Sequence, residues 1–283
     1  MSDIQRIGVI GAGTMGNGIA QVFTQSGFDV RLVDAAAPAL ERARTTIAKS
    51  LEKFVEKGKL TPADRDAALG RLSSGTDVDA LADADYIVEA IVEDAGAKGA
   101  LFTSLGAITG PGVVLASNTS SISITLLGAA SGRPDRVLGM HFMNPVPIMT
   151  LVELVRAQAT SDQSMQTALE LCAALCKTAV EAADYPGFIS NRVLMPMINE
   201  AIYAVMEGVG TAEAIDTVMK LGMNHPMGPL ALADFIGLDV CLSILNVLQD
   251  GFGDPKFRPC PLLRRMVAAG HLGRKSGRGF YTY

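Results

Sequence analysis

A glycine-rich turn near the start of the chain limits the possible folds more than any other feature. Residues 7–10 form an apolar run typical of a buried parallel strand. Residues 11–16 read Gly-Ala-Gly-Thr-Met-Gly, and a helical pattern follows from residue 14 to about residue 26. A glycine-rich turn between a strand and a helix is the start of a dinucleotide-binding βαβ unit.

The three glycines of this turn have separate roles. Gly11 permits the sharp turn, Gly13 lets backbone N–H groups approach a pyrophosphate, and Gly16 lets the helix and strand pack closely. The helix N-terminus adds about half a positive charge facing the phosphates. We therefore expect this segment, including Thr14 and Met15, to bind a dinucleotide cofactor.

A carboxylate follows where such a cofactor requires one. The second apolar run, residues 30–33, leads directly into Asp34, which lies 18 residues after Gly16. A carboxylate at this place accepts hydrogen bonds from the adenosine ribose. Because Asp34 would repel a 2′-phosphate and only Arg31 is a nearby cation, the sequence favours NAD over NADP.

Strand-like and helix-like segments alternate through the first half of the chain. Helical patterns cover residues 38–57 and 62–72, the second starting with Thr61 as N-cap. Further strands are predicted at 86–88, 113–116, 136–140 and 151–155. This alternation predicts a Rossmann-type α/β domain with a mostly parallel sheet.

The composition changes near residue 185. Beyond it the pattern is helical only, over residues 188–207, 212–221, 229–248 and 261–269. We therefore expect an NAD-binding Rossmann-type domain over residues 1–185 and an all-helical domain over residues 186–283.

Length and charge exclude several classes of protein. A chain of 283 residues corresponds to roughly two domains, at about 150 residues each. The 24 Lys and Arg against 29 Asp and Glu give a net charge of −5, which disfavours a nucleic-acid partner or an anionic membrane surface. No run of about 20 apolar residues predicts a membrane span. The three histidines show no metal-site spacing, so no metal is expected.

The cysteines indicate the compartment. They lie among apolar neighbours without a CxxC spacing, and we interpret them as buried small hydrophobic residues in a reducing compartment: Cys172, Cys176, Cys241 and Cys260. The N-terminal segment leads straight into the first strand without a signal-like pattern, so the expected location is cytoplasmic.

A histidine and a glutamate are the first candidates for chemistry. His141 closes the strand predicted at residues 136–140, and ligands of such sheets bind at the carboxyl ends of strands. Glu153 interrupts the apolar strand 151–155, where an unpaired carboxylate is costly. His141 is the partner we expect for Glu153, while an Arg or Lys partner stays open. Paired in this way, the imidazole is suited to take or return a proton.

Four motifs occur together and in order. They are SNTSS at 117–121, HFMNPVP at 141–147, PGFISNR at 186–192 and GRKSGRGFY at 273–281. With these motifs the whole chain resembles the L-3-hydroxyacyl-CoA dehydrogenase family, and within it the short-chain bacterial enzymes that act on 3-hydroxybutyryl-CoA. The resemblance implies NAD-dependent interconversion of an (S)-3-hydroxyacyl-CoA and the 3-ketoacyl-CoA. It also implies that the helical domain forms a homodimer.

The resemblance also implies roles for individual residues. His141 is similar to the family's catalytic base and Glu153 to the carboxylate that orients it. Ser120 and Asn191 fall at positions that hydrogen-bond the reacting oxygens of the substrate; without the resemblance, a loop turn and a helix cap are the better interpretations. Positions similar to cofactor contacts are Glu93, Lys98, Asn118, Ser120 and Asn144, and positions similar to CoA contacts are Ser50 and Lys57.

The sequence departs from the family pattern in one place and leaves two alternatives open. Residues 94–97 read Asp-Ala-Gly-Ala, where larger residues are usual, which predicts a weaker local helix. A dehydrogenase of free 3-hydroxy acids is one alternative, although such enzymes generally use a lysine for acid-base chemistry. A non-catalytic NAD-binding protein is the other.

Overall fold

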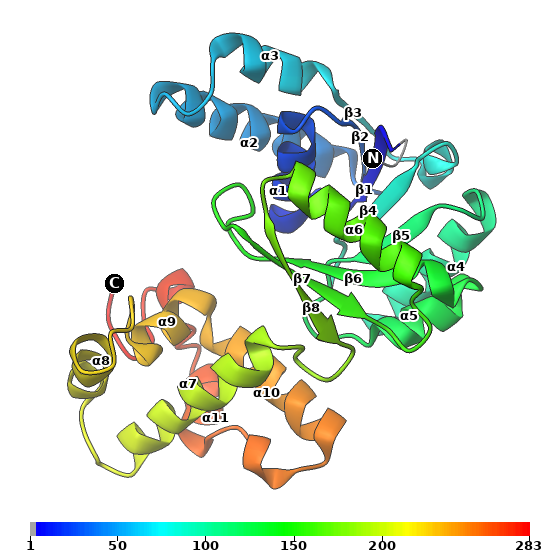
Figure 1. Cartoon of the computed structure of the whole chain (residues 1–283). Coiled ribbons are helices and arrows are strands. Elements are labelled where there is room, and N and C mark those ends of the chain that lie inside the picture. The colour runs from blue at the N-terminus through cyan, green and yellow to red at the C-terminus, as the bar shows by residue number, and fades with distance from the viewer. Residues whose placement is uncertain (1–3) are drawn as a thin grey trace. The chain divides into compact units, whose positions relative to one another are not determined.

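The computed structural model describes residues 4–283 and divides the chain into two compact units (Figure 1). The first unit ends at Asp184, and the second runs from Tyr185 to Tyr283. The first contains a sheet with helices, and the second is helical. The predicted fold class is confirmed.

One eight-stranded sheet forms the centre of the first unit, in the order β3-β2-β1-β4-β5-β6-β7-β8. All neighbouring strands are parallel except β6 and β7, which are antiparallel. The strand order reverses between β1 and β4, and ligands of such sheets bind at the carboxyl ends of the strands at this point. The strands are β1 Arg6–Ile10, β2 Asp29–Val33, β3 Leu72–Gly75, β4 Tyr86–Glu89, β5 Val114–Ser117, β6 Val137–Phe142, β7 Leu151–Arg156 and β8 Thr178–Ala183.

Helices connect the strands and bury their apolar side chains against the sheet. One core cluster joins Phe23 of α1, Ile47 of α2 and Leu171 of α6 to the strands, and α4 packs against α5. The helices of this unit are α1 Thr14–Gln25, α2 Ala37–Glu56, α3 Pro62–Gly70, α4 Ala95–Ile108, α5 Ile124–Ser131 and α6 Asp162–Ala174. The departure at residues 94–97 does not prevent α4 from forming, because the Asp94 side chain caps it by accepting from the Ala97 N–H at 2.7 Å.

The second unit has its own core. Ile198 and Ile202 of α7 pack with Leu230 of α9, Leu245 of α10 and Leu263 of α11. The helices are α7 Ser190–Met206, α8 Ala212–Leu221, α9 Pro229–Ile236, α10 Leu238–Phe252 and α11 Pro261–Ala268.

The prediction of a single helix at residues 229–248 is wrong. The structure has two helices there, α9 and α10, which meet at an angle of 98°. Gly237 separates them with a φ of +105°, a conformation that ends a helix and that side chains rarely adopt. The apolar pattern continued across the break because both helices bury residues in the same core.

Two strands at the sheet edges carry no clear sequence signal. β3 reads Leu-Ser-Ser-Gly and begins at Leu72, which pairs with Val30. α3 ends at Gly70, two residues before the end predicted for it. β8 is mostly exposed and contains three alanines. β6 extends to Phe142, so His141 lies inside the strand and not after it.

Three further expectations from the sequence concern the cysteines, metal sites and membrane-spanning helices. Three of the four cysteines are buried, but Cys176 is exposed, because it lies in the turn after α6 with a φ of 53°. Over residues 4–283 no group of three or more His, Cys, Asp or Glu side chains is arranged to hold a metal ion. In the same range no single helix is long and apolar enough to cross a bilayer; α9 and α10 reach that length and composition only as a bent pair.

Candidate active site

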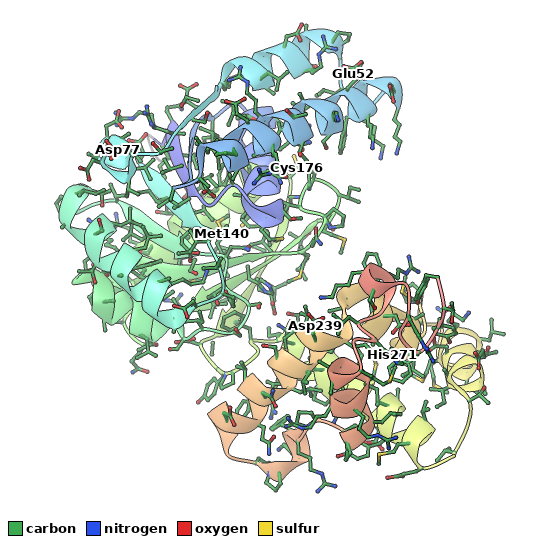
Figure 2. All side chains as sticks on the ribbon, turned by 180° about the vertical axis from the view of Figure 1, so that it is seen from behind. Glu52, Asp77, Met140, Cys176, Asp239 and His271 are labelled. Atoms are coloured by element: carbon green, nitrogen blue, oxygen red, sulfur yellow. The ribbon has the colours of Figure 1, made fainter. Side chains whose placement is uncertain are left out.

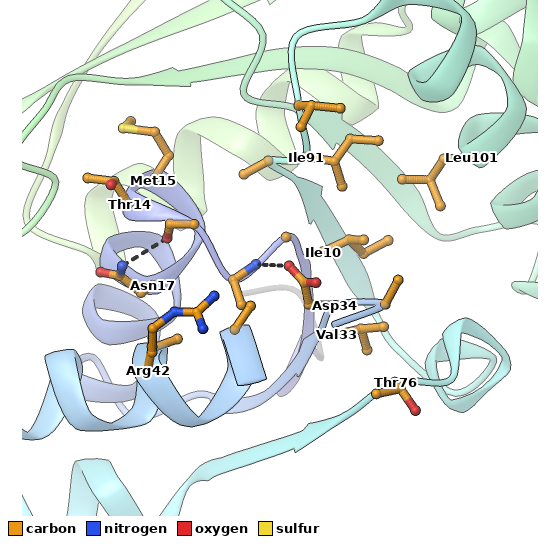
Figure 3. Close-up of a pocket in the computed structure, with 18 of the residues that line it drawn as sticks. Ile10, Thr14, Met15, Asn17, Val33, Asp34, Arg42, Thr76, Ile91 and Leu101 are labelled. Carbon is orange, nitrogen blue, oxygen red and sulfur yellow. Dashed lines mark hydrogen bonds between the residues drawn. The ribbon is translucent and has the colours of Figure 1, made fainter. Parts of the chain in front are cut away.

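The glycine turn opens onto a cavity of about 880 Å³ in the first unit (Figure 3). Gly11 adopts a φ of +100°, and a Cβ there would lie 2.4 Å from the Ala90 carbonyl oxygen. A Cβ on Gly16 would lie 1.7 Å from the carbonyl oxygen of Gly11, so the helix can approach the strand only with glycine here. A Cβ on Gly13 would meet nothing within 4 Å, which leaves open space at the start of α1. A phosphate group fits this space.

The far side of this cavity is formed by the end of β2. Asp34 accepts the Ala12 N–H at 2.7 Å and the Ala36 N–H at 2.9 Å, so its carboxylate is fixed toward the glycine turn. Arg42 of α2 lines the same cavity, so the expectation that Arg31 is the only nearby cation is wrong. The predicted cofactor residues that line it are Gly11, Gly13, Thr14, Met15 and Asp34, a set that fits the pyrophosphate and ribose of NAD.

His141 and Glu153 lie directly opposite each other on the antiparallel strands β6 and β7. Their Nδ1 and Oε2 atoms are 2.8 Å apart, and the residues are only 9% and 2% exposed. A carboxylate can only accept hydrogen bonds, so in this contact Nδ1–H of the ring donates to Glu153, and Nε2 is the ring nitrogen that Glu153 does not contact. The sheet register therefore places an imidazole against a buried carboxylate.

The Glu93 carboxylate accepts hydrogen bonds from several residues of the polar loop that follows β5. Its Oε1 accepts the Thr119 hydroxyl at 2.6 Å, the Ser121 hydroxyl at 2.9 Å, and both the N–H and hydroxyl of Ser120. Lys98 lies 3.4 Å from its other oxygen. Burial raises the pKa of Glu93, but the hydrogen bonds and the Lys98 charge outweigh it and lower the pKa overall. Glu93 is thus ionised and holds Ser120 in place.

Lys98 is buried, although the family resemblance implies a cofactor contact for it. It is 1% exposed, and its ammonium lies 2.5 Å from Oε1 of Glu89, which is fully buried. Glu89 also accepts the Ser117 hydroxyl at 2.6 Å and the Ile91 N–H at 2.7 Å. Glu89 is not among the residues predicted from the sequence. Its sequence signal is a carboxylate directly after the apolar run of a buried strand.

Asn118, Asn144 and Asn191 lie in different settings. Oδ1 of Asn118 accepts the Phe142 N–H at 2.8 Å and so ties the end of β5 to β6. Asn144 is exposed on the loop after β6. Asn191 belongs to the second unit, where it is 9% exposed in the first turn of α7; Ile189 is the N-cap, so Asn191 is not a cap.

A second cavity, of about 590 Å³, lies along α2 and is lined by four lysines. Ser50 and Lys57, the residues expected to contact CoA, both line it. The other three lysines are not among the residues predicted from the sequence, although the spacing of Lys49, Lys53 and Lys57 places them on one helix face. The remaining lining residues are Thr46, Phe54, Lys59 and Ile148. Such a concentration of positive charge suits a phosphate-bearing ligand.

Comparison with known proteins agrees with this geometry. Residues 6–185 match the family model for the 3-hydroxyacyl-CoA dehydrogenase NAD binding domain, and residues 187–283 match the model for the C-terminal domain. A probable 3-hydroxybutyryl-CoA dehydrogenase of Deinococcus radiodurans is 59% identical over 98% of this chain and 100% of its own. A 3-hydroxybutyryl-CoA dehydrogenase of Bradyrhizobium diazoefficiens is 53% identical over 99% of this chain and 96% of its own.

A solved structure extends the match to three dimensions. The crystal structure of (S)-3-hydroxybutyryl-CoA dehydrogenase from Ralstonia eutropha superposes with a TM-score of 0.97 at 49% identity, covering 99% of each chain. The matches span both units and reach almost the full length of these relatives. The chain belongs to the 3-hydroxyacyl-CoA dehydrogenase family and is an NAD-dependent dehydrogenase.

Proposed function

We propose that the protein interconverts (S)-3-hydroxybutyryl-CoA and acetoacetyl-CoA, with His141 as the proton carrier. The 2.8 Å contact between His141 and Glu153, buried in the sheet that carries the nucleotide cavity, is the observation on which this rests. The names of the relatives support a short-chain 3-hydroxyacyl-CoA substrate.

In the oxidation direction the hydroxyl proton passes from the oxygen on carbon 3 to Nε2 of His141 as the C–H bond of that carbon breaks. NAD, when bound, accepts the hydride. Glu153 holds the ring and stabilises the imidazolium that forms. The Ser120 hydroxyl turns from its 3.3 Å contact with Glu93 to donate to a substrate oxygen, while the Ser120 N–H, which donates to Glu93 at 2.9 Å, keeps the residue in position. The family resemblance gives Asn191 the same role as a donor to the substrate.

The remaining predicted site residues bind the two ligands. Asp34 accepts the adenosine ribose hydroxyls, and Gly13 admits the pyrophosphate. Glu93, Asn118 and Asn144 face the rest of the cofactor, and Lys98 acts through Glu93. Ser50 and the lysines of the second cavity bind the phosphates of CoA.

We also propose a cytoplasmic homodimer, with residues 1–185 as the cofactor domain and residues 186–283 as the helical domain that mediates pairing. Large apolar side chains are exposed on the second unit: Val193, Val209, Val218, Leu221, Met223 and Phe235. The free cysteines fit a reducing compartment. Light scattering tests the pairing, since a monomer mass at micromolar concentration would contradict it.

An NADH oxidation assay tests the substrate. We expect rapid turnover of acetoacetyl-CoA and little of free acetoacetate, because only the thioester carries phosphates for the lysine-lined cavity. Equal turnover of both would favour a dehydrogenase of free 3-hydroxy acids, and turnover of neither would contradict the proposed substrate.

A further inference from the structure

Lys177 lies at the edge of the sheet, beside the loop that joins β6, which carries His141, to β7, which carries Glu153. It follows α6 and Cys176, which is labelled in Figure 2, and it precedes Thr178, the first residue of β8. Leu151 of β7 pairs with Thr178, whose N–H donates to the Thr150 carbonyl at 2.7 Å. This register brings Lys177 beside the end of the loop at residues 143–150.

The Lys177 ammonium holds two carbonyls of this loop. Nζ donates to the Val146 oxygen at 2.7 Å and to the Met149 oxygen at 2.5 Å. The side chain is half-buried, and burial lowers its pKa in spite of an opposing effect of Cys172 and Cys176. A partly buried ammonium that donates to two carbonyls cross-links them, unlike a surface lysine without partners.

The loop connects three parts of the site. It starts directly after β6, which carries His141, and ends before β7, which carries Glu153. Val146 packs over α1, where a Cβ on Gly18 would lie only 2.9 Å from the Val146 Cβ. Ile148, between the two residues that Lys177 binds, is 67% exposed and lines the lysine-rich cavity.

We propose that Lys177 is a positioning residue for the CoA part of the substrate. By fixing the carbonyls on either side of Ile148, it makes that side chain a rigid wall of the cavity along α2. The inference rests on the proposed function, in that the lysine-lined cavity must hold CoA. His141 and Glu153 are held by the strand ladder, so their pairing does not depend on Lys177.

The test is steady-state kinetics of Lys177→Met and Lys177→Arg. Methionine keeps the apolar stem but removes both donated bonds, so we expect the KM for acetoacetyl-CoA to rise about tenfold. Arginine keeps two donors and should hold the increase below about threefold. We expect kcat and the KM for NADH to stay within about twofold of wild type, since the acid-base pair and the Val146 packing remain.

A truncated substrate separates positioning from general loosening. Acetoacetyl-N-acetylcysteamine carries the same acyl group without the nucleotide of CoA, so its KM should not change in Lys177→Met. Ile148→Ala alters an exposed side chain and should reproduce the selective loss even if Lys177→Met folds poorly. Lys256→Met, which removes a positive charge from the second unit, should leave both KM values unchanged.

The outcomes distinguish this inference from the proposal beneath it. If Lys53→Met and Lys57→Met leave the KM for acetoacetyl-CoA unchanged, the lysine-lined cavity does not bind CoA, and the role of Lys177 is refuted too. If those variants raise KM but Lys177→Met and Ile148→Ala do not, only the role of Lys177 is refuted. The role of Lys177 would also be refuted if Lys177→Met raised the KM equally for acetoacetyl-CoA and acetoacetyl-N-acetylcysteamine. A similar rise in KM for Lys256→Met would refute it as well.

Discussion

Replacing Glu153 by glutamine removes one negative charge from the acid-base pair and changes little else. The side chain keeps its shape, and its amide oxygen can still accept the Nδ1 proton of His141. The substitution removes the contribution of the negative charge to the hydrogen bond between Nδ1 of His141 and Oε2 of Glu153, which are 2.8 Å apart. Glu153 is only 2% exposed.

The size of the effect follows from this burial. A hydrogen bond to a charged group contributes about 1.5–3 kcal/mol, and the upper value applies where water does not compete. A loss of about 2.7 kcal/mol in the transition state is about 100-fold in rate. We therefore expect Glu153→Gln to lower kcat about 100-fold while the dissociation constant of NADH stays within about twofold.

The assay follows NADH absorbance with acetoacetyl-CoA, with NADH binding measured by fluorescence. Glu181→Gln is the matched control, because Glu181 lies on the neighbouring strand β8, is exposed and pairs with Arg156. It should retain wild-type kcat. A Glu153→Gln enzyme within about threefold of wild type would refute the reasoning that a buried charge drives the proton transfer.

Three further predictions concern the cofactor site. Asp34→Ser should weaken NADH binding about 30-fold, seen by fluorescence titration, because a charged acceptor for the ribose is lost; unchanged affinity would remove its role. Gly16→Ala should lower the midpoint of thermal unfolding strongly or prevent folding, since its Cβ would lie 1.7 Å from a backbone oxygen, whereas Gly13→Ala should keep that midpoint and lose NADH affinity. Because the pKa of Glu93 is lowered in the folded state, its charge stabilises the protein above pH 4.5, the ordinary value, and less as the pH falls below it. The difference in unfolding midpoint between wild type and Glu93→Gln should therefore narrow in acid, and a constant difference would contradict the shift.

The central strands of the fold were predictable because their burial leaves a continuous apolar run. β1, β4 and β5 lie between other strands and consist mainly of Val, Ile, Leu and Ala. The other residues are Arg6 and Gly8 in β1, Tyr86 and Glu89 in β4, and Ser117 in β5. The edge strands β3 and β8 are stabilised by pairing on one side only and can be polar or small, so their sequences resemble loops. The break at Gly237 was missed because a glycine is compatible with a helix until its φ is known.

The site was predictable to the extent that local pattern determines it. The glycine turn and Asp34 follow from strand and helix periodicity, and the interrupted apolar strand singled out Glu153. Glu89 was missed although it follows the apolar run of a buried strand, the same kind of signal that singled out Glu153. Lys177 was not found, because what identifies it is its contacts with a loop about 30 residues earlier in the chain. Lys98 shows the same limit: the sequence gives no sign that Glu89 holds its ammonium in the interior.

A double-mutant cycle of His141→Gln and Glu153→Gln, read as the rate of NADH formation in a single turnover, tests the proton relay most directly. If the carboxylate acts only through the imidazole, removing it from an enzyme that already lacks the imidazole costs nothing further. We predict that the double variant is as slow as His141→Gln alone, within about twofold. If the rate reductions of the two single variants multiply in the double variant, the two side chains act independently, which would contradict a proton transfer in which Glu153 acts through His141.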